Sequence, residues 1–240
     1  MKMLIMAKKP ISFWYRLLDL ISPRLCVVCG KRLSAIEDVI CLSCNLKLPR
    51  TDYSKNPYEN EMAKLFWGQI PIERAAAFFY YESHSNTANI IYKLKYKNHP
   101  EIGPVMGRKV SVEFQRDNFF DGIDGIVPVP LTKKRLRRRG YNQSEEIAKG
   151  VSEITGLPIF SNIVKRMVFK SSQTNKSRLG RRENVEHVFE LNGELPDNVK
   201  HLLVVDDVVT TGSTVIACAH QLAKIDGIRI SVLSLGLTKR

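Results

Sequence analysis

The segment LLVVDDVVTTGST, residues 202–214, carries the residues best suited to chemistry. Its apolar start predicts a central strand of a parallel sheet that is covered on both faces. Asp206 and Asp207 then lie at the carboxyl end of that strand, where open α/β sheets place their ligands. The small residues that follow, with Gly212 among them, predict a loop before a helix that begins near Thr214. Backbone N–H groups at such a helix start bind phosphate. Two carboxylates beside a phosphate loop indicate a ligand with hydroxyls next to its phosphate, such as ribose 5-phosphate.

This loop differs from the two best-known phosphate-binding sequences. No lysine follows Gly212, so it is not a Walker loop, and the pattern G-x-G-x-x-G is absent. The alternative interpretation is an ordinary helix start after a strand whose two acids are only solvated.

Four of the five cysteines form two closely spaced pairs, each with two residues between its members. The pairs are Cys26 with Cys29 and Cys41 with Cys44. Such spacing brings four thiolates to one tetrahedral point, which suits Zn2+. Two disulfides or four unrelated core thiols are the alternatives, and disulfides are disfavoured in a chain without a secretory signal. Because protein would supply all four ligands, the metal is expected to be structural. Cys218 lies in a helical pattern and is expected to fill core space.

The net charge of +13 is concentrated in one part of the chain. Residues 131–182 hold 14 basic and 3 acidic residues, and so carry +11 of it. Six cations occur within the seven residues from Lys133 to Arg139. A charge so localised indicates an anionic ligand, either a small phosphate compound or nucleic acid. A solvated charged loop is the alternative. Tyr141 beside the run is a candidate for stacking on a base of single-stranded nucleic acid.

A second basic segment follows, with seven cations and no acid in residues 165–182. Its polar composition predicts a mobile loop of the kind that closes over a ligand.

Strands and helices alternate through the last two thirds of the chain, which predicts an α/β fold with a largely parallel sheet. The expected strands are residues 74–83, 124–131, 187–191, 200–207 and 228–237. The expected helices are residues 87–98, 103–117, 142–156 and 214–227. Apolar residues at helical spacing between Ile11 and Ile21 predict a short amphipathic helix near the start. We expect a small cysteine module with that helix in residues 1–70 and the α/β domain in residues 71–240. No apolar run reaches the roughly 18 residues that a membrane span needs, and we expect a cytoplasmic protein.

Residues 202–214 resemble the signature of type I phosphoribosyltransferases, which bind 5-phosphoribosyl-1-pyrophosphate (PRPP) with Mg2+. Further motifs resemble the ComF family of competence-associated, phosphoribosyltransferase-like proteins with an N-terminal zinc module. They are the cysteine segment at 17–33, LKYKN, VPVPLTKKRLRRRGYNQS and QTNKSRLGRRENVEHVF, in the order of the family. The resemblance implies a type I phosphoribosyltransferase-like fold with a double-zinc-ribbon-like module.

The resemblance also implies roles for individual residues. The acid pair Asp206 and Asp207 would be catalytic. PRPP would be held by Val208, Val209, Thr210, Thr211, Gly212, Ser213 and Thr214. The residues that would bind the pyrophosphate or belong to the closing loop are Lys133, Arg137, Arg139, Arg166, Gln173 and Arg181. The family pattern also includes Asn184.

Two functions stay open. The first is a protein that binds Mg-PRPP and single-stranded DNA in DNA uptake, with a DNA-uptake helicase or recombination proteins as partners. The second is an active phosphoribosyltransferase that transfers phosphoribosyl from PRPP to a nitrogen acceptor. We do not expect a glutamine-dependent amidotransferase, because its nucleophile is an N-terminal cysteine, whereas Lys2 stands here and the first cysteine is Cys26.

Overall fold

The structure is a computed structural model that describes residues 23–167 and 188–239. The expected N-terminal helix lies outside these residues, as do Gln173, Arg181 and Asn184. Contacts divide the chain into two compact units, Met1–Leu48 and Pro49–Arg240. The expected division into domains 1–70 and 71–240 stays a prediction.

The first unit is built around its cysteines. Leu25 and Arg32 form an antiparallel bridge on either side of the first pair. The short helix α2 (Leu42–Leu46) begins at Cys41, whose sulfur accepts a hydrogen bond from the N–H of Cys44. The cysteine pairs therefore set the local backbone of this unit.

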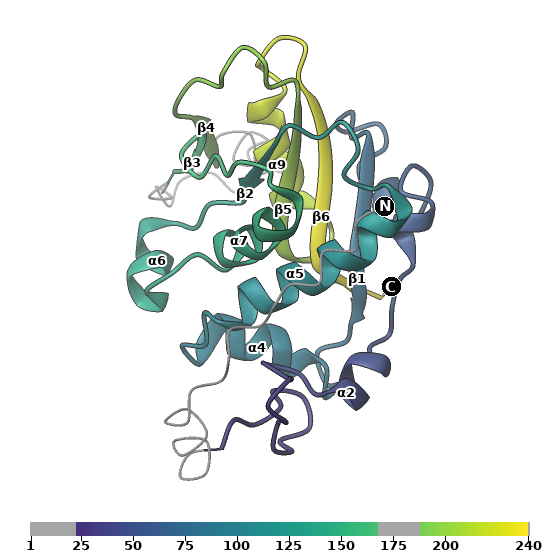
Figure 1. The fold of residues 1–240 in the computed structure, drawn as a ribbon. Coiled ribbons are helices and arrows are strands. Elements are labelled where there is room, and N and C mark those ends of the chain that lie inside the picture. The colour runs from purple at the N-terminus through teal and green to yellow at the C-terminus, as the bar shows by residue number, and fades with distance from the viewer. Residues whose placement is uncertain (1–22, 168–187, 240) are drawn as a thin grey trace, which may run out of the picture. The chain divides into compact units, whose positions relative to one another are not determined.

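The second unit holds the α/β fold (Figure 1). Its strands are β1 (Arg74–Tyr81), β2 (Gly125–Pro128), β3 (Val164–Arg166), β4 (Phe189–Leu191), β5 (His201–Val209) and β6 (Arg229–Thr238). Its helices are α3 (Glu61–Lys64), α4 (Ala88–Tyr96), α5 (Ile102–Phe114), α6 (Lys133–Arg139), α7 (Gln143–Thr155) and α9 (Ser213–Leu222), with single 3-10 turns at Tyr53–Lys55 and Gln115–Asp117. The predicted alternation of strand and helix is confirmed.

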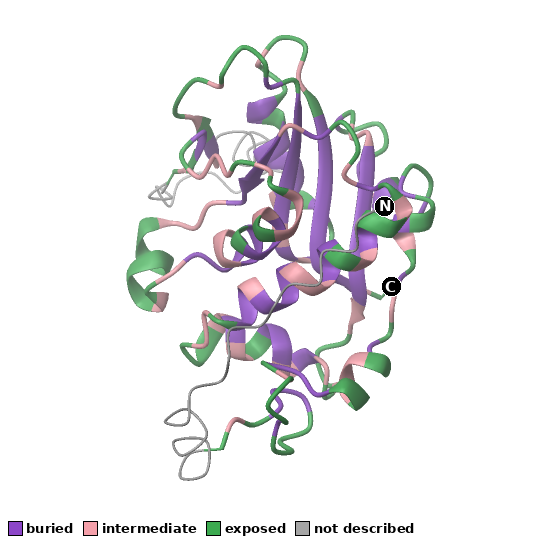
Figure 2. Cartoon of the chain, viewed as in Figure 1, coloured by how far each residue is buried: buried purple, intermediate pink, exposed green. Residues whose placement is uncertain are grey.

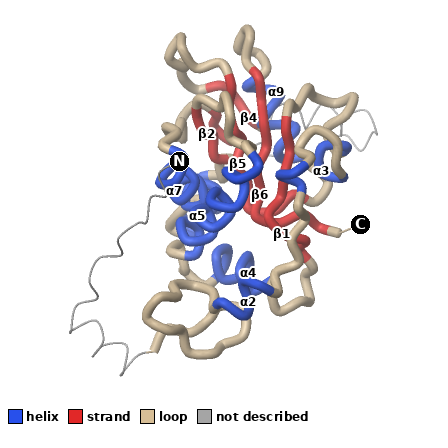
Figure 3. Tube along the Cα trace, turned by 45° about the vertical axis from the view of Figure 1, so that its right-hand side comes forward, coloured by secondary structure: helices blue, strands red, loops and turns tan. Residues whose placement is uncertain are grey.

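Four strands form a parallel sheet in the order β1-β6-β5-β2 (Figure 3). These strands are buried along most of their length (Figure 2). The expected α/β class, with a largely parallel sheet flanked by helices, is therefore confirmed.

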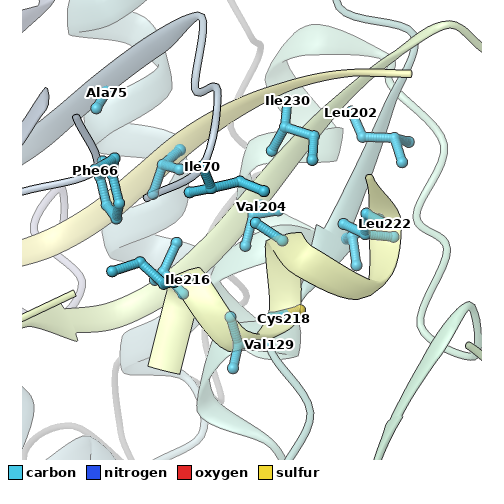
Figure 4. Close-up of a cluster of buried hydrophobic side chains, with 14 of the residues drawn as sticks. Phe66, Ile70, Ala75, Val129, Leu202, Val204, Ile216, Cys218, Leu222 and Ile230 are labelled. Atoms are coloured by element: carbon cyan, nitrogen blue, oxygen red, sulfur yellow. The ribbon is translucent and has the colours of Figure 1, made fainter. Parts of the chain in front are cut away.

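Each face of the sheet is covered by different elements. On one face, α9 packs on Leu202 and Val204 of β5 together with Phe66 and Ile70 (Figure 4). On the other face α5 and α7 lie side by side (Figures 1 and 3). Their backbones approach so closely that a Cβ at Gly107 or Gly150 would overlap the opposite helix. This packing places the start of α7 beside the end of β5.

Three local features differ from the sequence predictions. Strand β5 runs on through Val209, because Val208 and Val209 pair with Gly236 and Leu237 of β6. The basic run is a helix and not a loop. The residues around Phe189 form a strand as predicted, but β4 pairs antiparallel with β3 outside the main sheet. Pairing partners far along the chain decide the first and third of these features.

Helix α6 has caps at both ends although it has no buried residue. The hydroxyl of Thr132 accepts a hydrogen bond from the N–H of Arg135, and Gly140 ends the helix with a φ of 82°. Arginine and lysine are good helix formers, so the caps and the propensity account for a helix that lacks an apolar stripe.

Candidate functional site

The two acids lie near the end of β5 and face different surroundings. The Ser144 hydroxyl, at the start of α7, donates a hydrogen bond of 3.1 Å to Asp206 Oδ1. The backbone N–H of Asp207 donates to the same oxygen at 2.8 Å. Burial, and after it the charge of Asp207, raises the pKa of Asp206 to about 7, although both hydrogen bonds favour the carboxylate. Asp206 therefore holds a proton for part of the time near neutral pH.

Asp207 is paired instead with a lysine from a different element. Its carboxylate lies 2.8 Å from Lys95 Nζ, on α4, and the residue is only 6% exposed. A buried carboxylate is costly without such a partner. Asp206 is thus partly protonated, and Asp207 has a counter-ion in Lys95. Both effects reduce the repulsion between two neighbouring carboxylates at one strand end.

The turn after β5 leads into a helix start that no side chain caps. Gly212 has a φ of 80°, a left-handed conformation that favours glycine, and it stands directly before α9. No side chain caps this helix start, so its first N–H groups have no partner within the helix. Asp206 and residues 208–215 line a small hollow of about 30 Å³ here. Thr211 and Ser213 are linked by a hydroxyl hydrogen bond of 2.8 Å at its rim.

The structure brings part of the predicted cation set to this strand end. Arg166, on β3, is half-buried with its guanidinium 5.1 Å from the centre of the Phe189 ring. Burial lowers the pKa of Arg166 and the charge of Arg135 lowers it further, whereas Asp206 opposes both. Arg166, Arg135 and Asp206 therefore lie within electrostatic reach of one another.

The other described cations are on α6. Lys133 and Arg137 are exposed, whereas Arg139 is half-buried with its guanidinium 5.2 Å from the centre of the Tyr96 ring. Tyr141 is half-buried too, and its hydroxyl donates a hydrogen bond of 2.6 Å to the carbonyl of Leu94. The tyrosine is thus held against α4, which weakens the expectation that its ring stacks on a base.

Two site residues escaped the sequence analysis. Lys95 lies in LKYKN, one of the motifs on which the family resemblance rests. That motif does not indicate that the lysine pairs with Asp207. Gln143 is only 1% exposed, and neither polar atom of its amide has a hydrogen-bond partner among the described residues. The motif GYNQS contains Gln143, and its burial at the start of α7 became visible only in the fold.

In the first unit, the four predicted cysteines come together. Their sulfur atoms all lie within 4.8 Å of one another, and the sulfurs of Cys29 and Cys41 are 3.9 Å apart. A zinc ion with Zn–S bonds of about 2.3 Å holds its sulfurs roughly 3.8 Å apart, so the cluster fits such an ion. All cysteines in the described residues are free thiols. Backbone N–H groups of Cys41 and Cys44 donate to Cys26 and Cys41 sulfurs, as suits thiolate ligands. The cluster of four cysteines could hold a zinc ion.

Cys218 is buried on α9, as predicted. Among the residues that the structure describes, no helix has the length and apolar character for crossing a membrane.

The second unit is thus a parallel α/β protein with an acid pair and, after it, a left-handed turn at Gly212 that leads into an uncapped helix start. The chain is 34% identical over 149 residues to the DNA utilization protein YhgH of Escherichia coli K12, a match that covers 61% of this chain and 65% of the relative. It is 32% identical over 152 residues to competence protein F of Haemophilus influenzae, with 61% and 66% covered. The chain is therefore a homologue of these DNA utilization and competence proteins, which confirms the resemblance to the ComF family. It spans just under two thirds of the length of the relatives it matches.

Comparisons with protein-family models and with solved structures give less information about this chain. No protein-family model matches the sequence. An adenine phosphoribosyltransferase from Leishmania tarentolae is similar in structure with a TM-score of 0.36 and 9% identity, over 75% of this chain and 88% of that one. A similarity at that level supports no conclusion about activity.

Proposed function

We propose that the chain binds Mg-PRPP at the end of β5. The observation that carries the proposal is the acid pair followed by the left-handed turn at Gly212 and the uncapped start of α9. The N–H groups of residues 210–214 would bind the 5-phosphate, and Asp206 and Asp207 would accept hydrogen bonds from the ribose hydroxyls. Bound Mg2+ would neutralise pyrophosphate charge, and carboxylate oxygens are suitable ligands for it. Arg166 and cations of α6 would face the pyrophosphate.

Phosphate binding at the turn can be tested by placing a side chain at Gly212. A Cβ at Gly212 would lie 3.2 Å from Cε1 of Phe66, and the left-handed backbone strains any other residue. Gly212→Val is expected to abolish PRPP binding in calorimetry with Mg2+. Gly227→Val is the matched control, because Gly227 has a φ of 70° in an exposed turn with open space around it. If both variants bind PRPP alike, the phosphate does not lie in this turn.

We also propose that α6 binds single-stranded DNA, with a role in DNA utilization or uptake like the one that the relatives' names state. Five of its six cations are exposed, which suits contacts with phosphates. Because Tyr141 is held against α4, phosphate contacts and not stacking support this proposal. A DNA-uptake helicase or recombination proteins remain partners suggested only by the family.

Salt dependence tests the DNA proposal. Changing Lys134, Arg137 and Arg138 to Gln is expected to flatten the slope of log K against log salt by about two, since each single-strand phosphate contributes about 0.7. Lys149, Lys200 and Lys224 are exposed cations on other elements, so their triple Gln variant changes the net charge equally and should keep the slope. Equal slopes for both variants would show that α6 does not contact the strand.

An active phosphoribosyltransferase is the second candidate. It is favoured by a groove beside the turn that an acceptor could occupy, lined by Glu61, Lys64, Leu65, Gln69 and Thr211. Pyrophosphate release from PRPP, measured with nucleobases and ammonia, distinguishes an enzyme from a binding protein.

Zinc at Cys26, Cys29, Cys41 and Cys44 is part of the proposal, with a structural role because four thiolates fill a tetrahedral site. A cytoplasmic location fits free thiols that serve as metal ligands.

A further inference from the structure

Glu37 holds the loop between the two cysteine pairs through its carboxylate. Oε1 accepts a hydrogen bond from the N–H of Leu42 at 2.6 Å, and Oε2 accepts one from the N–H of Ser34 at 2.8 Å. Leu42 is the first residue of α2 and directly follows Cys41. Glu37 thus joins the middle of the loop to the start of the helix that carries the second cysteine pair.

Arg24 connects the same loop to the first cysteine pair. Its guanidinium donates to two backbone carbonyls of the loop, those of Glu37 at 2.7 Å and Ser34 at 3.1 Å. Arg24 stands two residues before Cys26, and its own carbonyl accepts from the N–H of Leu33 at 2.8 Å. Arg24 therefore holds the loop from the side of the first pair, and Glu37 holds it from the side of the second.

A cluster of four thiolates requires the two pairs to meet, although eleven residues separate them. The N–H of Cys41 donates to the sulfur of Cys26 at 3.4 Å, and the N–H of Val27 donates to the carbonyl of Val39 at 3.0 Å. A loop that had to be ordered when the metal binds would add a cost in conformational entropy. Holding the loop beforehand removes part of that cost from metal binding.

We propose that Arg24 and Glu37 are positioning residues of the zinc site, which fix the loop between the cysteine pairs so that the four thiolates meet at one point. The inference rests on the proposed zinc site and gives neither residue a role as a ligand. Groups that hold metal ligands in place commonly change metal affinity by about ten- to a hundredfold.

Zinc transfer to a chromophoric chelator tests the inference in the full chain, purified with its zinc. Glu37→Ala and Arg24→Met should each weaken zinc binding about tenfold. The double variant should weaken it by less than the product of the two effects, because both residues act on one loop. Glu37→Gln should lie between Glu37→Ala and the parent, since its amide has one acceptor oxygen in place of two.

The variants also distinguish position from charge. Glu37→Ala removes a negative charge and Arg24→Met removes a positive one, so charge alone would change zinc affinity in opposite directions. Positioning predicts a loss for both. Lys31→Met is the control, because it removes an exposed cation of the same unit and keeps the backbone carbonyl that accepts from the N–H of Cys26 at 2.8 Å. It should bind zinc as the parent does.

The cobalt(II) form of each variant shows whether the ligands are intact. Its absorption should remain that of a tetrahedral site with four thiolates, since the proposal removes no ligand. A spectrum that has lost a thiolate in Glu37→Ala or Arg24→Met would overturn the inference, because lost ligation would then explain the weaker binding.

The outcomes separate this inference from the proposed zinc site. If the parent holds no zinc, the zinc site is wrong and the inference falls with it. If the parent holds zinc and both Glu37→Ala and Arg24→Met release it as the parent does, the zinc site stands and the inference is overturned. Opposite effects of the two variants would overturn it as well, because charge alone would then account for them.

Discussion

At the scale of single residues, Asp206 and Asp207 are neighbours with unequal surroundings. Alternation along β5 sends one side chain toward Ser144 and the other toward Lys95. Asp207 has an ammonium partner, whereas Asp206 has only hydrogen bonds and a pKa raised to about 7. Near neutral pH and without a ligand, the two acids therefore carry less negative charge than their sequence suggests.

Asp206→Asn is expected to stabilise the protein at alkaline pH. Because the folded-state pKa of Asp206 lies above its ordinary value of 3.8, folding takes up a proton between about pH 4 and pH 7. The free energy of unfolding therefore falls as pH rises through that window. Asparagine avoids this loss, so the variant should be more stable than the parent at pH 8 by about 2 kcal/mol. This is about half of the free energy that the whole pKa shift corresponds to, because solvent screens the partly exposed Asp206. The difference should shrink toward pH 4.

Urea unfolding at pH 4.5 and pH 8 measures this difference. Asp197→Asn, which removes an exposed carboxylate in a turn, is the control and should change stability little at either pH. A variant at Asp206 that is less stable than the parent at pH 8 would contradict the account.

At the scale of elements, the end of α4 connects the acid pair to the basic helix. Three successive residues make one contact each: Leu94 accepts from Tyr141, Lys95 pairs with Asp207, and Tyr96 lies under Arg139. Tyr141 and Arg139 stand at the junction of α6 and α7. One turn of helix thus holds α6 and the end of β5 in fixed relation.

Lys95→Met is expected to lower the free energy of unfolding by about 2 kcal/mol, because it leaves Asp207 buried without a counter-ion. The cost stays below that of a fully buried pair since the Lys95 side chain is 24% exposed. Adding Asp207→Asn to Lys95→Met should recover part of the loss, and a double-mutant cycle by urea unfolding measures the coupling. A double variant that is no more stable than Lys95→Met alone would show that the unpaired Asp207 carboxylate is not the cause of the loss.

The cysteine unit gives a prediction of its own. Purified without chelator, the protein should hold one Zn2+ per chain, and Cys41→Ser should lose it and loosen the first unit, because metal binding supplies much of the folding energy of so small a unit. Cys218→Ala should retain the metal, since Cys218 lies outside the cluster. Metal analysis by atomic emission gives the answer, and a parent protein without zinc would refute the prediction.

At the scale of the whole molecule, periodic patterns predicted most elements of the α/β unit. The apolar run before Asp206 and the spacing of Ile147, Ala148 and Val151 each determine an element from local sequence, and these residues are buried as expected. Helix α6 was missed as a helix because it has no apolar stripe. The pairing of β4 with β3 and the contact of Lys95 with Asp207 depend on residues far apart in the sequence. Spacing along the chain carries no information about contacts between residues so far apart in the sequence.

The site was predicted to a similar extent and for the same reason. The acids and the turn lie together within residues 202–214, and the four cysteines lie together within residues 26–44, so spacing along the chain was enough to locate each group. The partners that set the charge state of the acids come from α4 and α7, and only the fold brings them to β5.

The central claim is that this strand end binds PRPP, and calorimetric titration with PRPP tests it most directly. The parent protein is expected to bind PRPP only with Mg2+ present, and the double variant Asp206→Asn with Asp207→Asn should show no binding, because the acceptors for the ribose hydroxyls are lost. Asp197→Asn should bind as the parent does. A double variant that binds PRPP with the affinity of the parent, or a parent that does not bind it with Mg2+ at all, would contradict the account.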